Sequence, residues 1–158
     1  MEDTVVNSKE QKLRGTDIIA LSVRDMTPPE MQAKVMAMIA KETTIPNTNM
    51  VQFGNTVFIT HIKEDKSKSW GRAFNVDTAK NFIANGFRFF THLQDMGVKR
   101  YVTNYQGDTY DSAVKVWKKR ADTQEVDDDS DRTEIIMGKA KEKGETVVFI
   151  RLGEEPLI

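Results

Sequence analysis

The chain has 158 residues, with 23 lysines and arginines against 24 aspartates and glutamates and a formal net charge of −1. This length is typical of one domain, and the near-neutral charge removes the bulk electrostatic attraction on which nucleic-acid binding depends. The chain has no cysteine, which excludes disulfides, thiol nucleophiles and thiolate metal ligands. The sequence has no apolar run near the roughly 18 residues of a membrane span, and its polar N-terminus does not resemble a signal peptide.

The N-terminal third predicts an arm, a strand and a helix. Residues 1–16 are polar and aperiodic, which favours an arm that becomes ordered only against a partner. Residues 17–158 form the predicted single domain. The run at 17–23 (DIIALSV) predicts a strand, because it is too short for a buried helix. Thr27-Pro28-Pro29-Glu30 is typical of a helix start. The predicted apolar face of that helix is Met31, Val35, Met38 and Ile39.

The middle of the chain predicts an antiparallel meander followed by a crossover. Residues 51–53 and 56–62 are β-branched and aromatic, and Gly54-Asn55 between them is a hairpin turn sequence. Residues 69–76 predict the third strand. A long helix capped by Asp77, then a strand at 98–103, predicts a right-handed parallel crossover. The predicted apolar face of the helix is Ala79, Phe82, Ile83, Phe87, Phe90 and Leu93.

The C-terminal third predicts one more helix and a terminal hairpin. Gly107-Asp108 leads into the helix, and the hairpin strands are predicted at 133–137 and 146–151. The predicted helix face is Tyr110, Ala113, Val114 and Trp117. The full order is β-α-β-β-β-α-β-α-β-β. It predicts a mixed α+β fold whose mostly antiparallel sheet contains one parallel β-α-β crossover and about three helices.

This order of elements resembles the GNAT N-acetyltransferase superfamily over roughly residues 17–151. The most telling part runs from Trp70 to Trp117: a strand, a long helix, a strand and a short helix. The stretch Lys99-Arg100-Tyr101-Val102, before a polar turn and a helix, is also similar to the acetyltransferase-like internal virion proteins of short-tailed phages. The resemblance implies a GNAT-like sheet. In an active member, acetyl-CoA would enter between the strands at 71–76 and 98–103, with its pyrophosphate on the amides that open the long helix.

The resemblance also implies candidate site residues. Tyr105 and Tyr110 are candidates for the acid that protonates the departing CoA thiolate, because Trp117 stands where the family often has a tyrosine. An indole N–H is no proton donor near neutral pH. The candidates for cofactor binding are Phe74, Asn75, Val76, Asp77, Thr78, Ala79, Lys80 and Asn104.

The predicted cofactor turn departs from the family's glycine-containing Q/R-x-x-G-x-G/A segment. No glycine occurs between Arg72 and Phe82, although glycine lets a backbone approach phosphate closely. Asp77 also places a carboxylate where the phosphate would lie, and like charges repel. The fold implied by the resemblance is compatible with both departures, whereas the implied chemistry is weakened by both.

The sequence therefore predicts a non-catalytic acetyltransferase-like protein without a cofactor, a phage virion or phage accessory protein that acts through protein–protein contacts. Its expected partners are virion components or further copies of the chain, in the host cytoplasm or the virion. The alternative is an active N-acetyltransferase that uses acetyl-CoA with an atypical pyrophosphate turn. A nucleic-acid binder ranks third. Its basic residues would be Lys99, Arg100, Lys115, Lys118, Lys119 and Arg120.

Two further patterns point to no additional chemistry. His61 and His92 lack the hydroxyl residues that follow the histidines of two-histidine phosphodiesterases, so we expect half-buried or surface side chains. The alternating aspartates at 127–131 resemble a calcium loop. However, Arg132 and Gly138 occupy positions that need a glycine and a carboxylate. This segment is therefore predicted to be a solvated loop, and no metal site is predicted.

The large apolar side chains outside these motifs are interpreted as packing or contact residues. Trp70 and Trp117 are predicted to anchor the core. Five of the 8 methionines lie between residues 26 and 50, and such residues either fill irregular core gaps or form adaptable partner-binding surfaces. Met36 falls outside the apolar face of its helix, which favours an exposed contact.

Overall fold

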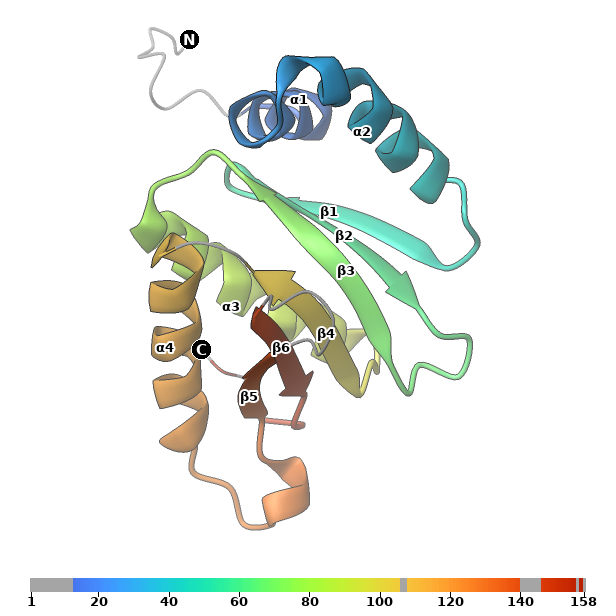
Figure 1. Ribbon diagram of the computed structural model, residues 1–158. Helices are drawn as coiled ribbons and strands as arrows, with labels where there is room; N and C mark the ends of the chain where they lie inside the picture. Colours follow the sequence, from blue (N-terminus) through green and yellow to red (C-terminus); the bar gives the residue numbers. More distant parts are fainter. Residues whose placement is uncertain (1–12, 106–107, 140–145, 156, 158) are drawn as a thin grey trace, which may run out of the picture.

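The computed structural model describes residues 13–105, 108–139, 146–155 and 157. These residues form four α-helices and one six-stranded sheet with helices on both sides (Figure 1). The helices are α1 (Gly15–Met26), α2 (Pro29–Glu42), α3 (Ala79–Asp95) and α4 (Asp108–Asp122). The strands are β1 (Thr48–Phe53), β2 (Thr56–Ile62), β3 (Ser69–Asn75), β4 (Arg100–Tyr105), β5 (Glu134–Lys139) and β6 (Thr146–Arg151).

The strands lie in the order β1-β2-β3-β4-β6-β5. Every neighbouring pair is antiparallel except β3 and β4, which are parallel and joined through α3. The mixed α+β class, with one parallel crossover in a mostly antiparallel sheet, is confirmed. The meander, the crossover and the terminal hairpin all lie where their turn residues and periodicity predicted them, and the arrangement is consistent with a GNAT-like fold.

The predicted strand at 17–23 is wrong, because these residues lie within α1. Ile18, Ile19, Ser22 and Val23 are all buried, a spacing that places them on one face of a helix. The apolar run is too short to distinguish a strand from part of a helix by itself. The described residues therefore form four α-helices where about three were predicted.

The predicted boundary between the arm and the domain at residue 16 falls inside α1. Leu13 already contacts the structured part: its N–H donates to Asn55 Oδ1 at 3.2 Å, its carbonyl accepts from Gln52 Nε2, and its side chain packs against the apolar cluster beneath α1. The remainder of the predicted arm, residues 1–12, lies outside the described residues.

Two apolar clusters hold the layers together. α1 and α2 pack on one face of β1–β3, where Val57, Ile59 and Phe74 meet Ile18 and Ile39. α3 and α4 cover the other face of the sheet with a larger aromatic cluster. The largest fully buried side chains of this second cluster are Trp117, Tyr101, Phe58, Phe82, Phe89 and Phe90.

The predicted apolar faces of two helices are partly wrong. On α2, Met31 and Met38 are exposed, Ile39 is buried, and Met36 packs against the α1 cluster. The contact face of α2 is therefore rotated, because this helix packs chiefly against α1. On α3, Phe89 is fully buried, although it was not part of the predicted face.

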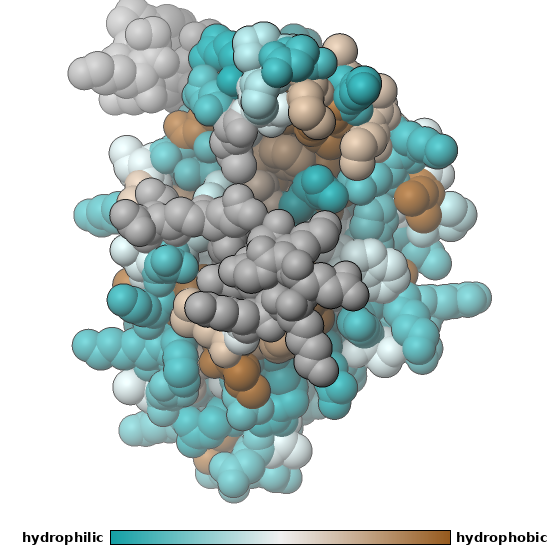
Figure 2. All heavy atoms as spheres, viewed as in Figure 1, coloured by the Kyte–Doolittle hydropathy of each residue, from teal (hydrophilic) through white to brown (hydrophobic). Residues whose placement is uncertain are grey.

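The helices leave half of one sheet face uncovered. α1 contacts β2 and β3, and α2 packs chiefly against α1 and reaches β3 through the Glu42–Arg72 ion pair. Neither helix extends over β4, β6 and β5 (Figure 1). Most of the surface on the side shown is hydrophilic, with a few separate hydrophobic patches (Figure 2). Within the described part of the chain, no helix has the length and apolar character needed to span a membrane.

Candidate functional site

The candidate site is the turn from β3 to α3, where β3 and β4 separate. The two strands pair at only three positions, Ser69–Tyr101, Trp70–Val102 and Gly71–Thr103. At the last pair, Thr103 Oγ1 donates a hydrogen bond of 2.9 Å to the Gly71 carbonyl. Beyond Gly71, β3 continues to Asn75 paired with β2. The parallel strands thus separate where the resemblance implies that the pantetheine arm would enter.

The Asp77 carboxylate lies at the centre of a polar cluster at this turn. Its Oδ2 accepts hydrogen bonds from the Asn55 backbone N–H at 2.7 Å and from Asn85 Nδ2 at 3.0 Å. Its Oδ1 accepts from Asn81 Nδ2 at 3.3 Å. The carboxylate therefore links the β1–β2 turn to two positions on the first two turns of α3.

Neighbouring polar side chains complete the cluster. Asn75 Oδ1 accepts from the Asp77 N–H at 3.2 Å and from Thr56 Oγ1 at 2.7 Å. Thr56 Oγ1 in turn accepts from Asn85 Nδ2 at 3.0 Å. Asn85 and Thr56 are both buried, so their hydrogen bonds satisfy polar groups that water does not reach. The turn is consequently held by side chains from three separate segments.

Asp77 was predicted to be the N-cap of the long helix, and this assignment is wrong. α3 begins at Ala79, and Thr78 is its N-cap, with its side chain accepting from the Asn81 N–H at 3.2 Å. The Asp77 side chain is turned toward the β1–β2 turn instead. A hydroxyl therefore satisfies one of the amides that open the helix, and the carboxylate stabilises tertiary structure.

The predicted cofactor-binding residues differ in their accessibility. Phe74 is buried in the apolar cluster beneath α1, where its ring is not accessible to a ligand. Asn75, Val76 and Asp77 are partly buried. The exposed residues of the set are Thr78, Ala79, Lys80 and Asn104.

Of the remaining predicted residues, Tyr110 and Asn104 lie on opposite sides of the sheet. Tyr110 lies on α4 with its ring edge-on to Phe82, with centroids 5.2 Å apart, and burial raises the pKa of its phenol. Asn104 lies on β4 opposite Val147. Because neighbouring strand residues alternate between faces, Asn104 faces away from the buried Tyr101–Thr103 side. The Tyr105 side chain lies outside the described residues, although its backbone pairs with Thr146.

The two tryptophans have different environments. Trp117 is fully buried, and its indole Nε1 donates to the Ile83 carbonyl at 2.9 Å, so its predicted role as a core anchor is confirmed. Trp70 is 47% exposed, and its predicted burial is wrong. Alternation along β3 places Trp70 on the α1–α2 side of the sheet, beside His61 with ring centroids 5.8 Å apart.

The two histidines are half-buried, as expected, and lie on opposite sides of the sheet. His61 Nδ1 lies 2.8 Å from Thr48 Oγ1 on the α1–α2 side. His92, on α3, has Nε2 3.2 Å from Asn49 Oδ1. One nitrogen of each ring has a local partner, and the sheet separates the two rings, so this geometry does not form an acid–base pair.

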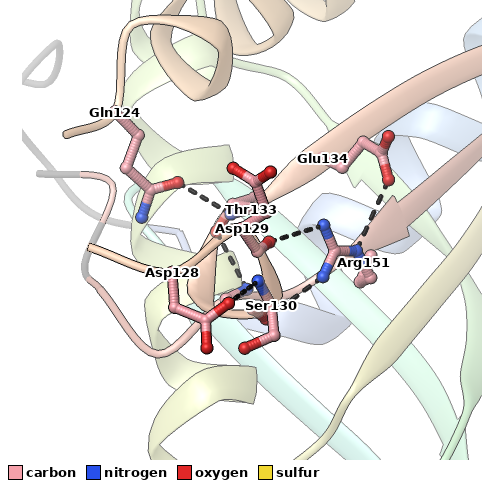
Figure 3. A network of polar contacts seen from close by, with 8 residues as sticks. Gln124, Asp128, Asp129, Ser130, Thr133, Glu134 and Arg151 are labelled. Atoms are coloured by element: carbon pink, nitrogen blue, oxygen red, sulfur yellow. Dashed lines mark hydrogen bonds and ion pairs between the residues drawn. The ribbon is translucent and has the colours of Figure 1, made fainter. Parts of the chain in front are cut away.

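The acidic segment at 127–131 is partly ordered by hydrogen bonds. Residues Asp129–Asp131 form a short 3₁₀ helix, η2, and the Asp128 carboxylate accepts from the Ser130 N–H at 2.9 Å, which lowers its pKa (Figure 3). Arg151 donates to the carbonyls of Asp129 and Ser130 at 3.1 Å and lies 3.4 Å from Glu134. The segment predicted as a solvated loop is therefore tied to the end of β6.

Sequence reasoning identified Asp77 but missed Asn55, Thr56 and Asn85. Asn85 carried a usable signal, since it lies three residues after Phe82 in an otherwise apolar helix face. A polar residue in a buried face requires a hydrogen-bond partner. The sequence offered no comparable signal for the partner's identity, because Asn55 and Thr56 lie on a distant hairpin.

Comparisons of the chain with protein-family models, with curated proteins and with solved structures found no match. The chemistry of the β3–α3 turn is therefore inferred from the residues of the turn alone. Those residues present a hydrogen-bonded carboxylate, a hydroxyl-capped helix start and no glycine, a set typical of a structural turn.

Replacing Asp77 with alanine is expected to lower the free energy of unfolding by about 2 kcal/mol. The change removes the acceptor of three donors, and each buried donor left without a partner costs about 1–3 kcal/mol, less where water can enter. Urea unfolding followed by circular dichroism measures the effect. Asp95→Ala, at the exposed end of the same helix, is the matched control and is expected to change stability by less than about 0.5 kcal/mol. Equal effects of the two changes would contradict the structural role of Asp77.

Proposed function

We propose that this chain is a non-catalytic acetyltransferase-like protein that acts through contacts with other proteins, as a phage virion or accessory protein. The observation that carries the proposal is the Asp77 carboxylate, fixed by hydrogen bonds from Asn55, Asn81 and Asn85 at the turn where an acetyl-CoA pyrophosphate would bind. The virion or accessory role is supported by the resemblance of residues 99–102 and the following helix to phage internal virion proteins.

The magnitudes favour exclusion of a pyrophosphate from this turn. Two like charges about 4 Å apart repel by about 4 kcal/mol at the effective dielectric constant of roughly 20 found near a protein surface. A helix N-terminus attracts an anion by only about 0.3–1 kcal/mol at an exposed site. Repulsion from Asp77 is therefore larger than the attraction that the start of α3 provides. The three hydrogen bonds also prevent the carboxylate from turning away without loss of stability.

An active N-acetyltransferase that uses acetyl-CoA is the second candidate, and one observation favours it. β3 and β4 pair at only three positions, and their separation is the feature that admits a pantetheine arm in the family. The acid would have to be Tyr110 or Tyr105. Tyr110 is half-buried against Phe82, and its raised pKa makes its phenol a weaker proton donor, which favours the non-catalytic proposal.

Isothermal titration with acetyl-CoA separates the two candidates. We expect no saturable heat with up to about 1 mM acetyl-CoA, because the turn repels the pyrophosphate. The same titration with ATP is the control for general anion binding, and a thermal-shift measurement with both ligands gives a second readout. Saturable binding of acetyl-CoA without binding of ATP would overturn the non-catalytic proposal and favour the enzyme.

A further inference from the structure

The sheet face that α1 and α2 leave uncovered carries a continuous apolar row. Val102 on β4 pairs with Phe149 on β6, and Phe149 pairs with Ile136 on β5. Phe149 is 48% exposed and Ile136 is 52% exposed. Trp70 on β3 pairs with Val102 and extends the row toward the helices. We call the uncovered face of β4, β6 and β5, with its central row Val102–Phe149–Ile136, the sheet floor.

At their centres, the strands of the sheet floor are apolar on both faces, whereas polar and charged residues lie toward their ends. On the side of α3 and α4, Tyr101, Val148 and Ile135 are almost completely buried. A strand exposed on one face usually alternates apolar and polar residues, whereas apolar residues on both faces are typical of strands covered on both sides. On β2 and β3 the corresponding residues are covered by α1 and α2. The central row of the sheet floor thus has the composition of a covered face without a covering element among the described residues.

One border of the sheet floor carries charges of both signs. Arg100, Arg151 and Glu134 form a row across β4, β6 and β5, because Arg151 pairs with both of the others. Arg151 is held by Glu134 and by the η2 carbonyls (Figure 3). Arg100 is exposed, and its guanidinium makes no ion pair within the described part of the chain. The row therefore has a free positive charge at one end and a half-exposed carboxylate at the other.

We propose that the sheet floor binds a second copy of this chain, about a two-fold axis that runs along β6 between the two sheets. This inference rests on the proposed function, since it names a partner for a protein that acts through contacts. The rotation exchanges β4 and β5 and keeps the residues of each row at the same level. Phe149 then meets Phe149 of the other copy, Val102 meets Ile136, and Arg100 meets Glu134. The two Arg151 side chains lie opposite each other, and each is held by Glu134 and the η2 carbonyls of its own copy.

The layer of α1 and α2 fits this arrangement. It covers only β1–β3 (Figure 1). On this side the half of the sheet under α1 and α2 is therefore raised by one layer of helices, and the half formed by β4, β6 and β5 is low. The two-fold rotation places each low half against the other. It carries the raised half of each copy beyond the β5 edge of its partner. The same surface on both copies can therefore make contact without a clash between the helical layers, as an isologous interface requires.

The size of the sheet floor sets the expected strength of the dimer. Three six-residue strands, with a spacing of about 4.8 Å and a rise of about 3.4 Å per residue, give a face of roughly 14 by 20 Å. Such a face has a footprint of about 280 Å² per copy, or about 560 Å² in total, which lies below the roughly 1,200 Å² at which stable specific interfaces begin and is typical of a weak, transient contact. We therefore expect a reversible dimer with a dissociation constant in the micromolar range.

Sedimentation velocity over a range of concentrations of the full chain tests the proposal. The expected result is a monomer–dimer equilibrium whose dissociation constant rises at least tenfold in Phe149→Ser. Val116→Ser is the matched control, because Val116 is 44% exposed on α4, away from the sheet floor. Circular dichroism of each variant separates loss of dimer from loss of fold. A wild-type chain that stays monomeric up to about 1 mM overturns the proposal, as does an equal effect of the two serine variants.

A charge exchange tests the two-fold pairing without changing the apolar row. Arg100→Glu and Glu134→Lys are each expected to weaken the dimer, and the double variant is expected to restore it, since the exchanged charges meet again across the axis. A double variant that dimerises more weakly than both single variants overturns the proposed pairing of Arg100 with Glu134 of the other copy. These outcomes are independent of the acetyl-CoA titration, so that a monomeric chain without acetyl-CoA binding would contradict the dimer while leaving the non-catalytic proposal intact.

Discussion

Replacing Trp117 with alanine is expected to lower the free energy of unfolding by about 3–5 kcal/mol, the usual cost of removing a buried large aromatic side chain. Trp117 is fully buried between α3 and α4, with ring centroids 5.1 Å from Phe90 and 5.5 Å from Phe82. Its indole also donates to the Ile83 carbonyl, which the alanine variant leaves without this donor. Urea unfolding followed by far-ultraviolet circular dichroism measures the difference.

Trp70→Ala is the matched control for this prediction. The same side chain is removed, but Trp70 is 47% exposed and lies beside His61, so we expect a loss of about 1 kcal/mol or less. A loss below about 1 kcal/mol for Trp117→Ala, or equal losses for the two variants, would contradict the packing of α4 on α3.

Gly71→Ala is expected to destabilise the protein by about 3 kcal/mol, at the upper end of the range for overpacking. A Cβ atom at this position would lie 1.9 Å from the Ile59 carbonyl oxygen on the neighbouring strand β2. The clashing atom belongs to the backbone of a paired strand and can move only if the sheet distorts. Gly71 is also the last residue of β3 that pairs with β4, so that the distortion falls where the two strands separate. The change is measured by urea unfolding.

The control for Gly71 is Gly138→Ala on β5. There the nearest atom to an added Cβ is Cε2 of Phe149, at 3.7 Å, an ordinary van der Waals contact. We expect a change in stability of less than about 1 kcal/mol, since alanine reduces the entropy of the unfolded chain relative to glycine. Similar losses for the two variants would show that strand glycines are equivalent in this protein, contrary to the close approach of β2 at Gly71.

The candidate site shows how far sequence reasoning extends. The absence of a glycine-containing turn and the position of Asp77 were both visible in the sequence, and they already weakened the expected chemistry. The direction of the Asp77 side chain was not visible, because its partners Asn55 and Asn85 lie 22 and 8 residues away. Local capping preferences predicted an N-cap, and a hydrogen bond to a distant hairpin turn determined the actual conformation.

The sequence by itself determined the elements whose signals are local. The hairpin turn at Gly54-Asn55, the apolar period of α3 and the stop at Gly97, which has a φ of 84°, depend on backbone preferences and side-chain spacing within a few residues. The tertiary structure alone decided that residues 17–23 form a helix, that Trp70 is exposed while Trp117 is buried, and that no element among the described residues covers the sheet floor. Burial depends on which elements pack together, and those contacts join residues far apart in the chain, whose pairing no local pattern records.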